Sequence, residues 1–285
     1  MPLDTTIMSL LYPIISFGIW PALPLTGYWL FFQSSRESGI DSVPRITSFS
    51  LMTVVGIVLW SIVLLSSAMA GIYRAGYFGL AGWFVTLFTL RELFIKKHFF
   101  IQESLRFSRW DWVLAAGFVL TACLYLGFPT ESIFLGRDEG LYANHAIYIA
   151  HHGRLDVPYP WPESLDTIFS KVFREVPGFF PTKTTMTVQF AHLFPVWLAQ
   201  AFATFGHHAL FRFEAMVALL SISIFYGLCR SVISRPYAVI ATLFLALNPS
   251  EIWLARRTLT EILTQLFIGS GLFLLLLAQK NNSKK

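Results

Sequence analysis

Residues 49–72 read Phe49-Ser-Leu-Met-Thr-Val-Val-Gly-Ile-Val-Leu-Trp-Ser-Ile-Val-Leu-Leu-Ser-Ser-Ala-Met-Ala-Gly-Ile72, without a single charged residue. One helix of about 20 mainly apolar residues is long enough to cross a bilayer. Similar runs recur along the chain, so we predict an all-α polytopic membrane protein with about seven transmembrane helices. The stretches are Met8–Phe32, Phe49–Ile72, Gly76–Ile95, Trp112–Phe128, Phe213–Cys229, Tyr237–Trp253 and Ile262–Ala278.

Composition supports this class. The chain of 285 residues is 55% hydrophobic and 13% charged, whereas soluble domains carry about 25% charged residues. The net charge of +5 would suggest nucleic acid for a soluble protein, but no basic stripe lies on a polar element, so we expect no nucleic-acid partner. Cys123 and Cys229 lie in apolar runs, which favours buried thiols over a disulfide. No cleavable signal peptide precedes the first run, whose Pro13, Pro21 and Pro24 predict a kink or a break.

Basic residues predict the orientation, because Lys and Arg gather in cytoplasmic loops. Only Arg74, Arg256 and Arg257 fall in one set of short loops. That set is therefore expected outside, with the N-terminus outside, the C-terminus cytoplasmic and the protein in the inner or plasma membrane. The opposite, cytoplasmic set holds Arg36, Arg45, Lys96, Lys97, Arg106, Arg109, Arg230, Arg235, Lys280, Lys284 and Lys285.

This topology places residues 129–210 outside, in a loop too long for a simple connector. The loop holds nearly half of the acidic residues and all but one of the histidines. Asp138 is a suitable N-cap and Gly153 a suitable stop, which predicts a helix between them. With polar and apolar residues on different sides, such a helix would lie along the membrane interface. Phe190–Phe205 is apolar but short, which suggests a second interfacial helix or a re-entrant segment.

Several polar residues have both a structural and a functional interpretation. Asp138 could simply cap its helix, or act as a general base or metal ligand. Arg256 and Arg257 suit a lipid phosphate, and Glu261 could join Asp138 around a divalent cation, yet Arg257 and Glu261 could equally form an i, i+4 pair. The stiff segments 157–163 and 177–183 could line a groove or act as spacers. The His151-His152 and His207-His208 pairs lack the spacing of a zinc site.

Short motifs in order around the spans resemble the GT-C class of membrane glycosyltransferases, in particular its protein-mannosyltransferase-like and aminoarabinose-transferase-like members. The resemblance runs from about Trp112 to Ala278. The motifs are Gly136–Tyr142, Phe180–Lys183, Phe205-Gly206 with Arg212, Tyr226–Arg230, Ala246–Pro249 and Ala255–Glu261.

The resemblance implies transfer of a sugar from a polyprenyl-phosphate carrier to a lipid, glycan or protein acceptor at the outer face. Asp138, with Glu139 beside it, takes the catalytic position, and Glu261 the second acidic position, where some members hold a divalent cation. Residues expected to contact substrate are Arg137, Tyr142, His145, Lys183, Arg256 and Arg257. No nucleotide is required, because a phosphate-linked sugar is already activated.

Three regions follow: residues 1–110, an appended unit of three spans; residues 111–279, the N-terminal part of a GT-C-like core; and residues 280–285, a cytoplasmic tail. Family members have more spans than this chain, so a truncated or split enzyme, completed by a second chain, is one expectation. The alternatives are a non-catalytic subunit that binds a polyprenyl-phosphate lipid and, less favoured, a transporter.

Overall fold

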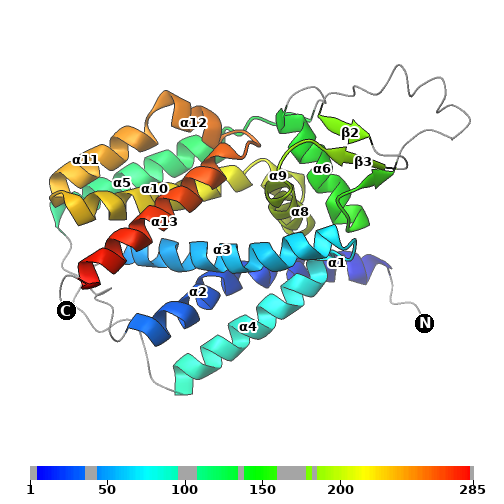
Figure 1. The fold of residues 1–285 in the computed structure, drawn as a ribbon, viewed down its shortest axis with the longest axis horizontal. Coiled ribbons are helices and arrows are strands. Elements are labelled where there is room, and N and C mark those ends of the chain that lie inside the picture. Colours follow the sequence, from blue (N-terminus) through cyan, green and yellow to red (C-terminus); the bar gives the residue numbers. More distant parts are fainter. Residues whose placement is uncertain are drawn as a thin grey trace, which may run out of the picture.

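A computed structural model describes residues 5–35, 44–95, 108–133, 138–158, 178–181 and 185–282. Within these ranges the chain is helical, as predicted, apart from three short strands (Figure 1). The elements are α1 (Thr5–Phe17), α2 (Ile19–Ser35), α3 (Arg45–Met69), α4 (Ala75–Ile95), α5 (Arg109–Gly127), α6 (Asp138–His152), β1 (Val157–Pro158), β2 (Phe179–Pro181), β3 (Thr185–Val188), α8 (Leu193–Phe205), α9 (His207–Leu210), α10 (Phe213–Val232), α11 (Arg235–Ala246), α12 (Pro249–Ala255) and α13 (Glu261–Asn282).

The described part holds five helices long and apolar enough to cross a membrane, which makes this a multi-pass membrane protein. The helices are α3, α4, α5, α10 extended to include α9, and α13. The α11–α12 pair adds a sixth span if its two helices, bent by 60°, count as one. The bend lies at Asn248, whose side chain accepts a hydrogen bond from the backbone N–H of Ser250 and so starts a new helix.

The count of about seven spans is therefore too high for the described residues. The difference comes from Met8–Phe32, which forms two helices, α1 and α2, separated at Gly18. Pro13 lies inside α1 and Pro24 inside α2, where each removes a backbone donor. The predicted break is present, and neither helix alone is long enough to be counted as a span.

Glycines bring α2 unusually close to both α3 and α4. A Cβ atom at Gly56 of α3 would collide with the backbone carbonyl of Leu23, and one at Gly82 of α4 with the backbone of Gly18 and Ile19, at the start of α2. Small residues at such crossings let helix backbones approach within a membrane, where packing rather than water release drives association. The result is a tight layer in which α2 packs against α3 and α4.

Helix α8 lies inside the bundle, packed against α6, α1 and α3. Most of its side chains are buried, including those of Trp197 and Gln200. The Trp197 indole donates to Ser61 Oγ at 2.8 Å, and the Tyr73 hydroxyl donates to Gln200 Oε1 at 3.0 Å. Of the two alternatives for this stretch, a surface position for an interfacial helix is wrong, because most side chains of α8 are buried in the bundle. The re-entrant alternative stays a prediction.

The first helices pack against the rest of the described chain: α3 contacts α8, α10 and α13, and α1 contacts α8. A small antiparallel sheet, in the order β1-β3-β2, follows α6. It pairs Val157 with Met186 and Phe179 with Val188. We did not predict this sheet. Of the two segments expected to be stiff, only residues 157–158 and 178–181 are described, and they supply β1 and β2.

Three connections meet at one end of the bundle, which we call the α6 end. The turn between α3 and α4 joins the end of α6 through a hydrogen bond from Tyr73 N to Gly153 O, at 3.0 Å. The connection after α5 joins the one after α12 through Thr130 N and Arg256 O, at 2.7 Å. The segments expected on one side of the membrane therefore lie together (Figure 1).

Candidate functional site

The first turn of α6 lies against the connection between α12 and α13. Glu139 of α6 is buried, and its carboxylate forms an ion pair with the guanidinium of Arg257. The hydroxyl of Thr258 donates to the backbone carbonyl of Glu139 at 3.0 Å. A side-chain bond and a backbone bond thus fix these two segments together, although they are distant in sequence.

The two arginines of the connection are each held by more than one partner. The Arg257 guanidinium lies 4.2 Å from the centre of the Trp253 ring, so an aromatic face and a carboxylate hold it together. Arg256 donates from Nε to the backbone carbonyl of Phe128 and lies 5.9 Å from that ring. The expected pair between Arg257 and Glu261 does not form, because α13 begins only at Glu261 and Arg257 is bonded to Glu139.

Tyr142 connects the two acidic positions that the sequence singled out. Its side chain is 4% exposed and packs on the rings of Phe190 and Phe194. Burial raises the pKa of the Tyr142 phenol; a hydrogen bond with Thr260 lowers it, and the negative charges of Asp138 and Glu261 raise it further. A single phenol therefore lies within electrostatic reach of both carboxylates.

Asp138 and Glu261 occupy equivalent positions in their own helices. Each is exposed and is the first residue of its helix, α6 and α13 respectively. A helix N-terminus favours negative charge there, because its first backbone N–H groups have no partner within the helix. Two carboxylates beside two arginines can accept a proton and bind an anionic group. Arg137 and Lys183, also expected to contact substrate, lie outside the described residues.

His145, which the sequence led us to expect in contact with substrate, is buried. The side chain is 2% exposed, its Nε2 donates to the backbone carbonyl of Leu155 at 2.9 Å, and its ring lies 5.6 Å from that of His192. Burial lowers the pKa of His145 to about 4, although the hydrogen bond to Leu155 opposes that shift. His145 is thus a neutral, buried side chain that holds the segment after α6, with no exposed surface for a substrate.

Among the described residues, no three His, Cys, Asp or Glu side chains are grouped closely enough to hold a metal ion. Asp138 and Glu261 therefore lack a third such ligand within this part of the chain. We derive no chemical step from the divalent cation that the sequence resemblance suggested.

A further acidic residue near the site is buried in α10. Glu214 of α10 is 1% exposed, and neither of its carboxylate oxygens has a hydrogen-bond partner among the described residues. The groups that face it are the backbone N–H groups of Ile262 and Leu263 and the carboxylates of Glu251 and Glu261. The available signal was an acidic residue at the start of an apolar run, where charge is costly.

Comparison of the chain with protein-family models, with curated proteins and with solved structures gives no match.

Proposed function

We propose that this protein is a membrane glycosyltransferase that moves a sugar from a polyprenyl-phosphate carrier to a lipid, glycan or protein acceptor. The observation that carries the proposal is the contact of the start of α6 with the connection before α13, through the Glu139–Arg257 ion pair and the Thr258–Glu139 hydrogen bond. This contact gathers Asp138, Glu261, Arg256 and Arg257 in two adjoining segments. The resemblance of short motifs to the GT-C class supports the same reaction.

In the proposed reaction an acceptor hydroxyl attacks the anomeric carbon of the sugar. The new glycosidic bond forms as the bond from that carbon to the phosphate oxygen breaks, and the polyprenyl phosphate leaves with the electron pair. Asp138, the exposed carboxylate, takes the proton of the acceptor hydroxyl. Arg256 stabilises the negative charge on the leaving phosphate, since a guanidinium binds phosphate through several donors.

Glu139 receives a different role from the one that its place next to Asp138 suggested. Its carboxylate is 6% exposed and already paired with Arg257, so it is poorly placed to accept a proton from a substrate. We assign Glu139 and Arg257 to positioning: together they hold the start of α6 beside the start of α13. Glu261 then lies across the site from Asp138, where it can orient the acceptor.

The test uses purified protein in liposomes with a labelled polyprenyl-phosphate sugar and extracted cell-envelope lipids and glycans as acceptors. We expect label to move to an acceptor, and no transfer from the corresponding nucleotide sugar. Donor binding without any transfer would contradict the enzyme and favour the non-catalytic carrier-binding subunit. Transfer from the nucleotide sugar alone would contradict the donor class.

We also propose that the α6 end faces the outside of the inner or plasma membrane, with the C-terminus in the cytoplasm. The basic residues Arg109, Arg230 and Arg235 support this orientation, because they lie at the opposite ends of α5, α10 and α11. A reporter that is active only in the cytoplasm should be active when it is fused after Lys285, and one that requires export should be inactive there. Activity of a reporter that requires export would reverse the orientation and, with it, the side of the reaction.

A further inference from the structure

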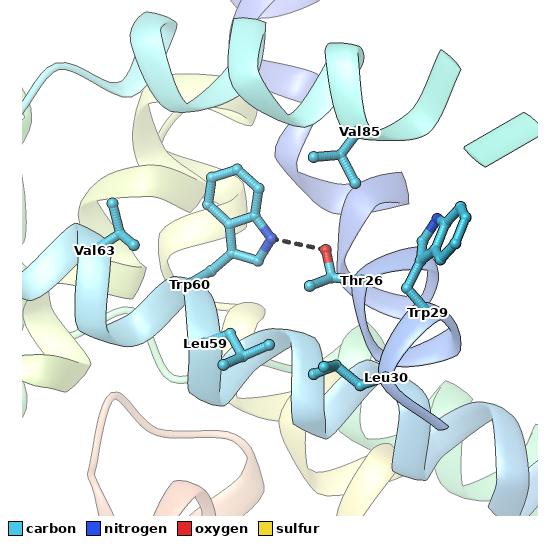
Figure 2. A pocket seen from close by; sticks show the side chains of 7 residues that line it. All are labelled: Thr26, Trp29, Leu30, Leu59, Trp60, Val63 and Val85. Carbon is cyan, nitrogen blue, oxygen red and sulfur yellow. Dashed lines mark hydrogen bonds between the residues drawn. The ribbon is translucent and has the colours of Figure 1, made fainter. Parts of the chain in front are cut away.

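The helices α2, α3 and α4 form an open groove away from the candidate site. Consecutive helices α3 and α4 diverge from their connecting turn and hardly touch each other, while α2 packs against both (Figure 1). Between them lies a cavity of about 340 Å³, with α2 as its floor. Figure 2 shows side chains from all three helices around this space, including Trp60 of α3 and Val85 of α4.

The lining of the groove is apolar and carries no charge. It consists of Thr26, Trp29, Leu30, Leu59, Trp60, Val63 and Val85. Its polar atoms are already used: Trp60 donates from Nε1 to Thr26 Oγ1 at 3.1 Å, Thr26 donates to the carbonyl of Ala22 at 2.7 Å, and Trp29 donates to Thr89 Oγ1 at 2.7 Å. The groove therefore offers nothing to a polar or charged ligand.

The rim of the groove lies on helices that are long and apolar enough to cross a membrane, where it would face the hydrocarbon. Leu30, Leu59 and Val63 on this rim are 52%, 36% and 51% exposed, and both α3 and α4 are membrane spans. Empty apolar space costs dispersion contacts on all its walls, and apolar cavities take up apolar molecules rather than water. At Gly56 and Gly82 the backbone of α2 already lies against α3 and α4, so the three helices cannot close the gap by moving together.

We infer that this groove binds one acyl chain of a membrane phospholipid. The occupant is not assigned to the proposed sugar donor, because no lining residue comes from α6, α12 or α13, which form the candidate site. The first three predicted spans thus carry a lipid site of their own, and this inference does not depend on the proposed function.

The test compares two double variants with the wild type. Val63→Phe/Val85→Phe places two rings in the groove, whereas Ile62→Phe/Leu87→Phe adds the same rings at neighbouring positions that are both 63% exposed and do not line it. Each protein is purified in mild detergent, and native mass spectrometry counts the phospholipids that remain bound. We expect the wild type and the second variant to retain one phospholipid more than the groove-filling variant.

Equal retention by all three proteins would overturn the inference, as would a polyprenyl phosphate in place of the phospholipid. If the groove-filling variant does not fold, quenching of tryptophan fluorescence in the wild type and in two single variants tests the inference instead. One equivalent of phospholipid with brominated acyl chains, added to delipidated protein in detergent, should quench tryptophan emission. Trp29→Phe should reduce that quenching and Trp112→Phe, on α5 outside the groove, should not. Equal quenching in both variants would contradict the site.

Discussion

Arg257 forms an ion pair with Glu139, although 118 positions separate the two residues along the chain. The Glu139 side chain is 6% exposed and that of Arg257 22% exposed, so water screens the pair only partly. The pair joins the first turn of α6 to the connection before α13. This contact brings the first residue of α6, Asp138, into the same region as the first residue of α13, Glu261.

Removing either partner of this pair alone should destabilise the protein, and the cost of removing both should be smaller than the sum of the two single costs. Glu139→Gln leaves the Arg257 guanidinium without its carboxylate, at a cost of about 3 kcal/mol. In the double variant Glu139→Gln/Arg257→Met we expect the costs to fall short of additivity by about 1–3 kcal/mol. Equilibrium unfolding in mixed detergent micelles measures these free energies.

The control is Arg91→Gln, at an exposed ion pair with Glu92, which should change the free energy of unfolding by less than about 0.5 kcal/mol. Additive costs would show that the two residues act independently.

The buried His145 should make the protein less stable in acid. Its pKa is lowered from 6.5 to about 4 by burial, so the unfolded chain binds a proton before the folded protein does. The stabilisation is complete above about pH 6.5 and is lost as the pH falls toward 4, by about 3 kcal/mol. Burial also lowers the pKa of His192, which adds a loss of the same sign.

The measurement for this prediction is the unfolding free energy between pH 7.5 and pH 4. His145→Gln, which keeps a donor for the Leu155 carbonyl, should lose less stability over this interval than the wild type. His152→Gln changes an exposed histidine of the same helix and should follow the wild-type curve. A His145→Gln curve parallel to that of the wild type would show that His145 is not the source of the acid sensitivity.

The helix crossings at glycine should not tolerate even a methyl group. Gly56→Ala forces the α3 backbone away from the carbonyl of Leu23, and overpacking of this kind costs about 1–3 kcal/mol. Gly271→Ala, in the interior of α13 with nothing within 4 Å of the added carbon, should be neutral or slightly stabilising. Thermal unfolding of both variants in detergent provides the comparison. Equal melting temperatures would mean that α2 and α3 do not approach each other so closely.

Glu214 is costly to keep, since its carboxyl is buried without a hydrogen-bond partner in the described part of the chain. An unpartnered buried polar group costs about 1–3 kcal/mol. Glu214→Met, of similar volume, should therefore be at least as stable as the wild type, whereas Gln200→Met, which breaks the bond with Tyr73, should be less stable. A less stable Glu214→Met variant would indicate a partner for the carboxyl, with the backbone amides of Ile262 and Leu263 as the nearest candidates.

The sequence predicted most of the spans because a helix of about 20 mainly apolar residues is stable in the hydrocarbon of a bilayer. It predicted α6 from its ends, since Asp138 and Gly153 mark a helix start and stop, and Gly153 has a φ of 73°. It could not separate a buried apolar helix from a surface one, and so left the position of α8 open between an interfacial helix and a re-entrant segment. Periodicity carries no such information when apolar residues surround the whole helix.

The functional role of the candidate site residues stays a prediction, but the structure shows which of their contacts the sequence could not reveal. The acidic and basic residues of the loops pointed to Asp138, Glu261, Arg256 and Arg257, because water-facing charges concentrate there. Pairing was not predictable: Arg257 bonds to Glu139 in a distant helix instead of Glu261 nearby. Burial of His145 also depended on α8 and on the segment after α6, which packing alone brings together.

The most direct test of the proposed site is the transfer assay with Asp138→Asn, which removes the proton acceptor but keeps the size of the side chain. Its control is Glu131→Gln, a 47% exposed acid in the connection just before α6. We expect Asp138→Asn to be folded and inserted but to lose sugar transfer, with Glu131→Gln retaining the wild-type rate. Wild-type transfer by folded Asp138→Asn would contradict the account.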